Sequence, residues 1–254
     1  MRCSQCNTEN NDDHRFCFNC GIPLTGNKPE PNLPAVGHAA DEGERRQLTV
    51  MFCDIVDSTT LSMQYDPEVL REIIRQFQDT CVVVVERYEG FVAQHLGDGL
   101  LIYFGYPSAH EDDGERAVHA GLGIIEAVSA MRPRPDLQLY VRIGIATGKV
   151  VIGDLVSAGA NIEKVAVGQT PILAARLQGL ATPNTVVISP HTYRLLGQRF
   201  EYREIGVHTL KGIPEPVRVR EVIGHGARKS RFAATRTGQF LLVIIIVIGF
   251  LKSC

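Results

Sequence analysis

The sequence lacks several features that would each point to a definite class of protein. Its 26 basic side chains are matched by 28 acidic ones, and it has no tryptophan, so the basic and aromatic stripe of a nucleic-acid-binding protein is not present. The opening residues, MRCSQCNTEN, lack the apolar run of a secretory signal, and we therefore expect a cytoplasmic, reducing environment. Seven cysteines in 254 residues are too few for a disulfide scaffold. An apolar content of 44% excludes a wholly disordered chain.

Four of the seven cysteines form two close pairs at the start of the chain: Cys3 and Cys6, then Cys17 and Cys20. Each CxxC turn directs two thiolates at one point, and two such turns build the four-sulfur tetrahedral site that suits Zn²⁺. Residues 1–24 cannot bury a core, so a structural zinc would supply the folding free energy. This segment resembles the zinc-ribbon modules of bacterial regulators. The alternative is two redox dithiols or unstructured cysteines.

Composition divides the rest of the chain into three parts. Residues 25–44 are rich in proline and polar residues without periodicity, which predicts a flexible linker. Residues 45–223 are patterned. Residues 224–254 combine a basic segment with the apolar run FLLVIIIVIGFL at 240–251, whose twelve residues would span only about 18 Å as a helix. A full transmembrane helix is therefore not expected, and shallow membrane contact, a partner groove and a truncated C-terminus stay open.

Hydrophobic periodicity and turn residues predict an α+β fold in the patterned region, with helices on one face of a sheet. The predicted strands are Gln47–Val56, Phe91–Leu96, Leu100–Phe104, Leu137–Thr147, Val150–Leu155 and Thr185–Ser189, with two more near Tyr202 and at Val217–Val222. The predicted helices are Glu68–Tyr88, Glu111–Met131, Thr170–Leu180 and a short one from Pro190. Hairpin turns are expected at Gly97-Asp98-Gly99 and at Gly148-Lys149.

Asp54 is the residue in this region that most needs a partner, because it interrupts the apolar strand sequence VMFCDIV. A buried carboxylate costs several kcal/mol unless it is paired or binds a metal. Asp98 lies at the tip of a hairpin that could pair with this strand, which would bring the two acids together. Two converging carboxylates without Cys or His favour Mg²⁺ or Mn²⁺.

Three separated motifs give this region a family resemblance. The segments RQLTVMFCDIVDST (46–59), LGDGLLIYFGYP (96–107) and VGQTPILAARL (167–177) resemble the class III adenylate and guanylate cyclase catalytic domain. The resemblance implies a ferredoxin-like βαββαβ, palm-type core. It also implies that Asp54, Asp98 and the backbone carbonyl of Ile55 hold two Mg²⁺ or Mn²⁺ ions, while Arg176 and Lys211 contact the phosphates from the partner subunit of a homodimer.

The sequence departs from the pattern of that family at three positions. Ile172 stands where the family has an asparagine that orients the ribose, and isoleucine cannot form a hydrogen bond. Gln94 and Val165 replace the usual pair that reads the base. Because the Gln94 amide can both donate and accept, adenine recognition remains possible and guanine is not excluded, and ATP is the favoured substrate.

The sequence therefore leaves two hypotheses about function. The first is a homodimeric cyclase that converts ATP to cyclic AMP and pyrophosphate for intracellular signalling, slowed by Ile172. The alternative is a weak or inactive cyclase-like module for dimerisation or nucleotide sensing. The zinc ribbon would serve a protein partner, with no nucleic-acid partner expected.

Overall fold

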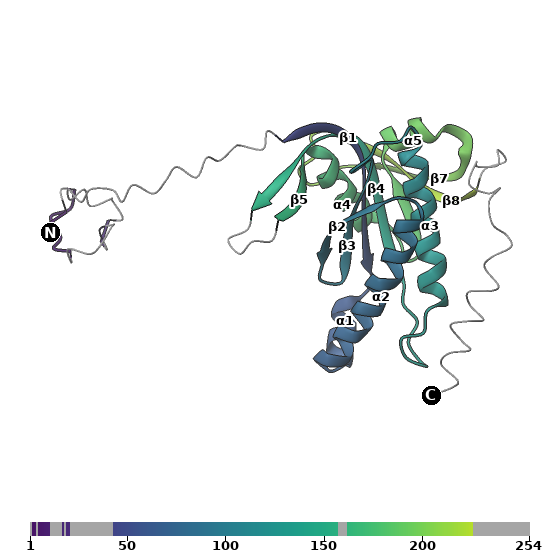
Figure 1. Cartoon of the computed structure of the whole chain (residues 1–254), viewed down its shortest axis with the longest axis horizontal. Helices are drawn as coiled ribbons and strands as arrows, with labels where there is room; N and C mark the ends of the chain where they lie inside the picture. Colours follow the sequence, from purple (N-terminus) through teal and green to yellow (C-terminus); the bar gives the residue numbers. More distant parts are fainter. Residues whose placement is uncertain are drawn as a thin grey trace. The chain divides into compact units, whose positions relative to one another are not determined.

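The computed structural model describes residues 2, 3, 5–10, 17, 19, 20, 43–156 and 162–225 (Figure 1). Contacts divide the chain into two units, residues 1–41 and 42–254, and each is considered by itself. Within the described parts, no helix is both long and apolar enough to cross a membrane. The apolar run at 240–251 and nearly all of the expected linker lie outside the described residues.

The second unit is built on a mixed sheet of eight strands. They are β1 (Glu44–Ile55), β2 (Phe91–Leu96), β3 (Gly99–Phe104), β4 (Val141–Val156), β5 (Ile162–Val167), β6 (Thr185–Ile188), β7 (Phe200–His208) and β8 (Val217–His225). Their order is β2-β3-β1-β4-β6-β8-β7, with β5 paired to β4 off this path. Among the described strands, β4 and β6 pair in parallel and the other pairs are antiparallel. The strand that carries Asp54 is therefore internal, between β3 and β4.

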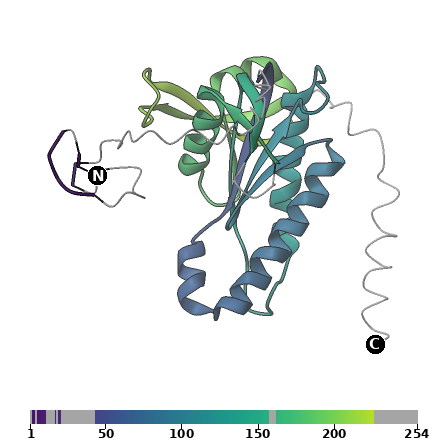
Figure 2. The same cartoon turned by 60° about the vertical axis from the view of Figure 1, so that its left-hand side comes forward.

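Helices cover both faces of this sheet (Figures 1 and 2). They are α1 (Ser58–Gln64), α2 (Pro67–Arg87), α3 (Asp113–Ala130), α4 (Gln169–Leu180) and α5 (Pro190–Leu196), followed by the 3₁₀ helix Gly197–Arg199. Buried residues of α2 and α3 share one core with Met51 and Cys53 of β1. Those of α4 share a second core with Leu48 and Val50. Because strand residues alternate between faces, Asp54 lies on the side of α4.

The α+β fold class is confirmed, and the position of α4 adds one detail to it. The sequence placed the helices on one face, whereas α4 packs against the other. Gly144 of β4 permits this arrangement, because a Cβ there would collide with the backbone of Ala174 and Gln178 in α4. The backbone of α4 is thus seated directly on the sheet.

One local prediction is wrong, and one short helix was missed. The hairpin expected at Gly148-Lys149 does not form, and β4 runs straight through it because β1 continues to pair with these residues, Leu48 with Gly148 and Gln47 with Lys149. Neither residue adopts the positive φ that a tight hairpin turn requires. The short helix α1 was not predicted at all, since its sequence STTLSMQ contains no apolar stripe and only Leu61 is buried.

Candidate active site

The carboxylate of Asp54 is held at one oxygen and unpartnered at the other. The side-chain amide of Gln178 donates a hydrogen bond to Oδ2 over 3.2 Å, and the Arg142 guanidinium lies 3.5 Å from the same oxygen. Oδ1 is buried and finds no donor among the described residues. A buried carboxylate oxygen with no donor is costly, and a cation would satisfy it. Neither Arg142 nor Gln178 was singled out from the sequence.

Asp98 is brought to Asp54 by the pairing of β1 with β3. The backbone N–H of Ile55 donates to the carbonyl of Asp98 over 3.3 Å, and Gly99 is the pairing partner of Asp54. Any side chain at Gly99 would press on the Cys53 carbonyl at 2.8 Å and on Oδ1 of Asp54 at 3.3 Å. Glycine at this position therefore keeps the space between the two acids open.

The charge of Asp98 acts on the carboxyl group of Asp54. Burial raises the pKa of Asp54 to about 6, and the neighbouring charge of Asp98 adds to this effect, while Arg142 and Gln178 partly offset it. A carboxylate whose ionisation is disfavoured by burial and by a neighbouring acid is a site for positive charge. The donor set is oxygen only, and the unpartnered Oδ1 gives it a free coordination position, so these residues fit a hard divalent cation such as Mg²⁺ or Mn²⁺.

Arg176 and Lys211 form a second group, on the far side of α4. The Nε–H of Arg176 donates to the backbone carbonyl of Lys211 over 3.1 Å, and both residues are exposed. Successive side chains of an α-helix are rotated by about 100° around its axis. Arg176 and Gln178 are two residues apart, so they project in nearly opposite directions. Within one chain, Arg176 thus points away from the Asp54 whose carboxylate Gln178 contacts.

The three positions that depart from the family pattern lie on two elements of the sheet and on α4. Ile172 is 46% exposed and lies one turn before Arg176, on the same outer side of α4. Gln94 is half-buried on β2, at a point where the register with β3 shifts. Val165 is half-buried on β5, and β2 and β5 contact each other.

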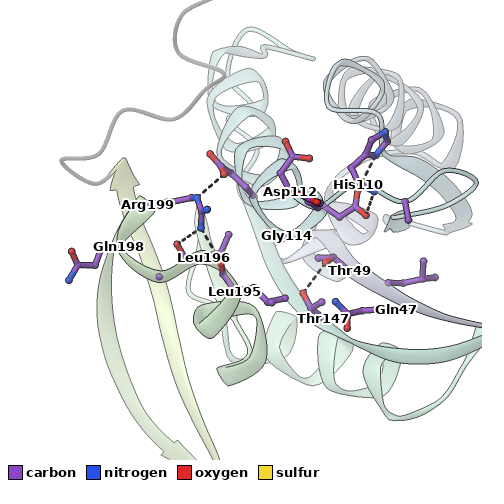
Figure 3. Close-up of a pocket in the computed structure, with 16 residues that line it drawn as sticks. Gln47, Thr49, His110, Asp112, Gly114, Thr147, Leu195, Leu196, Gln198 and Arg199 are labelled. Atoms are coloured by element: carbon purple, nitrogen blue, oxygen red, sulfur yellow. Dashed lines mark hydrogen bonds and ion pairs between the residues drawn. The ribbon is translucent and has the colours of Figure 1, made fainter.

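A cavity of about 1020 Å³ lies at the opposite end of β1 from Asp54. Figure 3 shows residues of its lining, among them Thr49 and Thr147, whose hydroxyls are 2.8 Å apart, and Arg199 beside the start of α3. The Arg199 guanidinium pairs with Glu115 over 3.1 Å. None of the residues predicted from the sequence to act on a nucleotide lines this cavity. It is formed where separate elements meet, β1, β4, the start of α3 and the segment after α5.

The first unit brings its four cysteines together. The sulfur atoms of Cys3, Cys6, Cys17 and Cys20 all lie within 4.8 Å of one another, with 3.6 Å between those of Cys3 and Cys20. A tetrahedral Zn²⁺ with Zn–S bonds of about 2.3 Å would separate its sulfurs by about 3.8 Å. Hydrogen bonds with Thr8 lower the pKa of the Cys6 thiol to about 6, which favours the thiolate that binds metal.

Comparison with known proteins agrees with this geometry. Residues 41–224 match the family described as the adenylate and guanylate cyclase catalytic domain, and residues 2–24 match the zinc-ribbon domain. The chain belongs to the adenylate and guanylate cyclase family. The resemblance drawn from the three motifs is thereby confirmed, together with the zinc ribbon.

Relatives of this cyclase domain include both adenylate and guanylate cyclases. Adenylate cyclase 1 of Rhizobium meliloti is 28% identical over 186 residues, which are 71% of this chain and 28% of that protein. The solved adenylyl cyclase CyaB of P. aeruginosa superposes with a TM-score of 0.68 at 26% identity, over 74% of this chain and 100% of that one. The guanylyl cyclase Cya2 superposes with a TM-score of 0.68 at 27% identity, over 74% of this chain and 98% of that one.

The chain spans only part of the curated relatives that it matches. It covers 19% of an uncharacterized Rhizobium meliloti protein to which it is 33% identical over 199 residues.

Proposed function

We propose that this chain is one subunit of a homodimeric nucleotide cyclase that converts ATP to cyclic AMP and pyrophosphate. One observation carries the proposal: the buried, unpartnered Oδ1 of Asp54 lies beside the hairpin of Asp98, on a domain of the cyclase family. In the reaction, the ribose 3′-oxygen forms a bond to the α-phosphorus as the bond to pyrophosphate breaks, and the hydroxyl proton passes to solvent.

The residues of the chain divide this chemistry between two subunits. Asp54, Asp98 and the carbonyl of Ile55 would hold two Mg²⁺ or Mn²⁺ ions, which when bound lower the pKa of the hydroxyl and neutralise the triphosphate. Arg176 of one subunit would stabilise the charge that develops at the α-phosphate in the site of the other, since its planar guanidinium matches phosphate geometry. Lys211 would bind the outer phosphates as a point charge.

The organisation and the metal content of the whole chain belong to the same proposal. We assign residues 1–24 to the zinc ribbon, 25–44 to a linker, 45–223 to the cyclase domain and 224–254 to the tail. Four sulfurs at tetrahedral spacing support a structural Zn²⁺ in the ribbon, whose place in a regulated enzyme would be to contact a protein partner.

A product assay tests the enzymatic proposal. Purified full-length protein is incubated with ATP or with GTP, in Mn²⁺ or Mg²⁺, and cyclic AMP and cyclic GMP are measured. We expect cyclic AMP from ATP, because the amide of Gln94 can both donate to and accept from adenine. A larger yield of cyclic GMP would reassign the substrate to GTP. If neither product forms, the chain is instead the nucleotide-sensing module that Ile172, Gln94 and Val165 suggest.

Restoring an amide at position 172 should speed the enzyme. Ile172 is exposed next to Arg176 and offers no hydrogen bond to the ribose, whereas Asn can orient it. We expect Ile172→Asn to raise kcat by about 10²-fold, the size typical of one polar contact to the reacting group. Steady-state cyclic AMP formation measures this change.

The control is Ile172→Leu, which alters shape without adding a donor and should leave kcat within about twofold of the wild type. An Ile172→Asn enzyme no faster than Ile172→Leu would show that the ribose is oriented without this position.

A further inference from the structure

Gln178 lies just after the third sequence motif, which ends at residue 177, at the contact between α4 and the strand that carries Asp54. It follows Arg176 by two residues, and its side chain reaches back to β1 instead of toward solvent. The backbone of Gln178 is fixed by the close approach of α4 to Gly144, where no side chain could be accommodated. The side-chain amide that contacts Asp54 therefore extends from a backbone whose position is fixed by packing.

The contact made by Gln178 is specific to one oxygen of Asp54. Its Nε2 lies 3.2 Å from Oδ2, and Arg142, the other donor to that oxygen among the described residues, lies at the longer distance of 3.5 Å. With Oδ2 anchored, the carboxylate plane can turn little, and Oδ1 is left beside Gly99 in the direction of the hairpin tip. A neutral amide achieves this orientation without cancelling the negative charge that a divalent cation needs.

We propose that Gln178 is a positioning residue that anchors Oδ2 of Asp54 so that Oδ1 is directed at the divalent cation. The inference rests on the proposed function, in which Asp54 binds Mg²⁺ or Mn²⁺. Groups that orient a metal ligand in this way typically change metal affinity by 10- to 100-fold when they are removed. Gln178 thus acts on the site of its own chain, while Arg176, on the other side of the same helix, serves the site of the partner.

Metal binding by the full-length dimer tests this role independently of turnover. Free Mn²⁺ is measured by electron paramagnetic resonance in the presence of 3′-deoxy-ATP, which lacks the attacking hydroxyl. We expect Gln178→Leu to bind Mn²⁺ about tenfold more weakly than the wild type. Gln178→His, whose Nε2–H can still donate, should recover part of this loss, and Asp54→Asn gives the background from other sites. The control Gln169→Leu alters an exposed glutamine at the start of the same helix and should bind Mn²⁺ as the wild type does.

Three results would overturn the proposal. The first is that Gln178→Leu binds Mn²⁺ as tightly as the wild type does. The second is that the wild type binds no more Mn²⁺ than the Asp54→Asn background. The third is that Gln178→Leu binds Mn²⁺ more weakly but also melts at a much lower temperature, and that Gln178→His does not improve its Mn²⁺ affinity. If the wild type binds Mn²⁺ but forms no cyclic nucleotide, and Gln178→Leu loses this binding, the positioning role would be upheld and the cyclase proposal rejected.

Mixed dimers separate an effect on Asp54 from one on Arg176. When Gln178→Leu is mixed with Arg176→Ala, one site of the mixed dimer combines an intact Gln178–Asp54 pair with the Arg176 of the other chain. If Gln178 acts only on its own Asp54, this mixture should be at least as active as a mixture of Asp54→Asn with Arg176→Ala. Activity at least tenfold below that level would place the effect of Gln178 on Arg176 and reject the proposal.

Discussion

Asp54→Asn should abolish cyclic-nucleotide formation and, in the absence of divalent cations, raise the melting temperature of the protein. The catalytic loss, about 10³-fold or more, follows because an amide cannot supply the charge that holds a divalent cation. The gain in stability follows from the raised pKa of this carboxyl group. Burial and Asp98 raise the pKa from 3.8 to about 6, so the folded state binds a proton more tightly than the unfolded state does.

The sign of this effect with pH is opposite to that of an ordinary salt-bridged acid. Because the folded pKa is raised, ionisation of Asp54 destabilises the fold progressively from about pH 4 to about pH 6, and the full penalty applies above that range. The side chain is 27% exposed, so solvent reduces the penalty to about 1–2 kcal/mol. For a chain of this size, Asn should therefore raise the metal-free melting temperature by about 2–8 °C at pH 8, and by much less at pH 4.

Calorimetry with a metal chelator at pH 4 and pH 8 measures the difference. Saturating Mn²⁺ should stabilise the wild type and leave Asp54→Asn unchanged, which reverses their order. Asp136→Asn, at an exposed acid in the loop before β4, is the control and should alter neither melting temperature nor activity. A metal-free Asp54→Asn protein that melts below the wild type at pH 8 would mean that the ion pair with Arg142 outweighs burial and repulsion.

The parts of the fold that the sequence predicted well are those in which local pattern and tertiary contacts agree. The helix α2 begins at Pro67, as the proline after Asp66 indicates, and the hairpin between β2 and β3 turns at Gly97 with a φ of 67°. In contrast, Gly148 looks like a turn residue only in isolation. Its conformation is decided by the ladder with β1, a strand about a hundred residues away, and local sequence carries no record of that pairing.

In the candidate site, too, residues marked by local sequence could be predicted and residues placed by tertiary contacts could not. An acid in an apolar strand is conspicuous, so Asp54 could be found from the sequence, and the glycines around Asp98 indicated the turn that carries it. Arg142 and Gln178 could not be found, because nothing in their own segments distinguishes them from ordinary exposed polar residues. Their role arises from strand register and from the close packing of α4, both of which depend on the assembled sheet.

Two inactive variants should restore activity when they are mixed. Asp54→Asn removes the metal-binding half of a site, and Arg176→Ala removes the half that stabilises the transition state, so each homodimer should be at least about 10²-fold slower than the wild type. In a mixed dimer, one site receives both defects and the other receives neither. With equal amounts and free exchange of subunits, half the dimers are mixed and each has one of two sites intact, so about a quarter of wild-type activity should return.

The direction of the side chains in a single chain is the physical reason to expect this recovery. Gln178 donates a hydrogen bond to Asp54 from one side of α4, and Arg176 donates one to the backbone of Lys211 from the opposite side. Arg176 therefore does not point at the acids of its own chain. Cyclic AMP formation by each variant alone and by the refolded or co-expressed mixture measures the recovery. A mixture of Arg176→Ala with a Lys211→Ala variant is the matched control, because both defects then lie in the same half of the site and no intact site can form. Recovery in that control, or none in the Asp54→Asn mixture, would mean that each site is built within one chain.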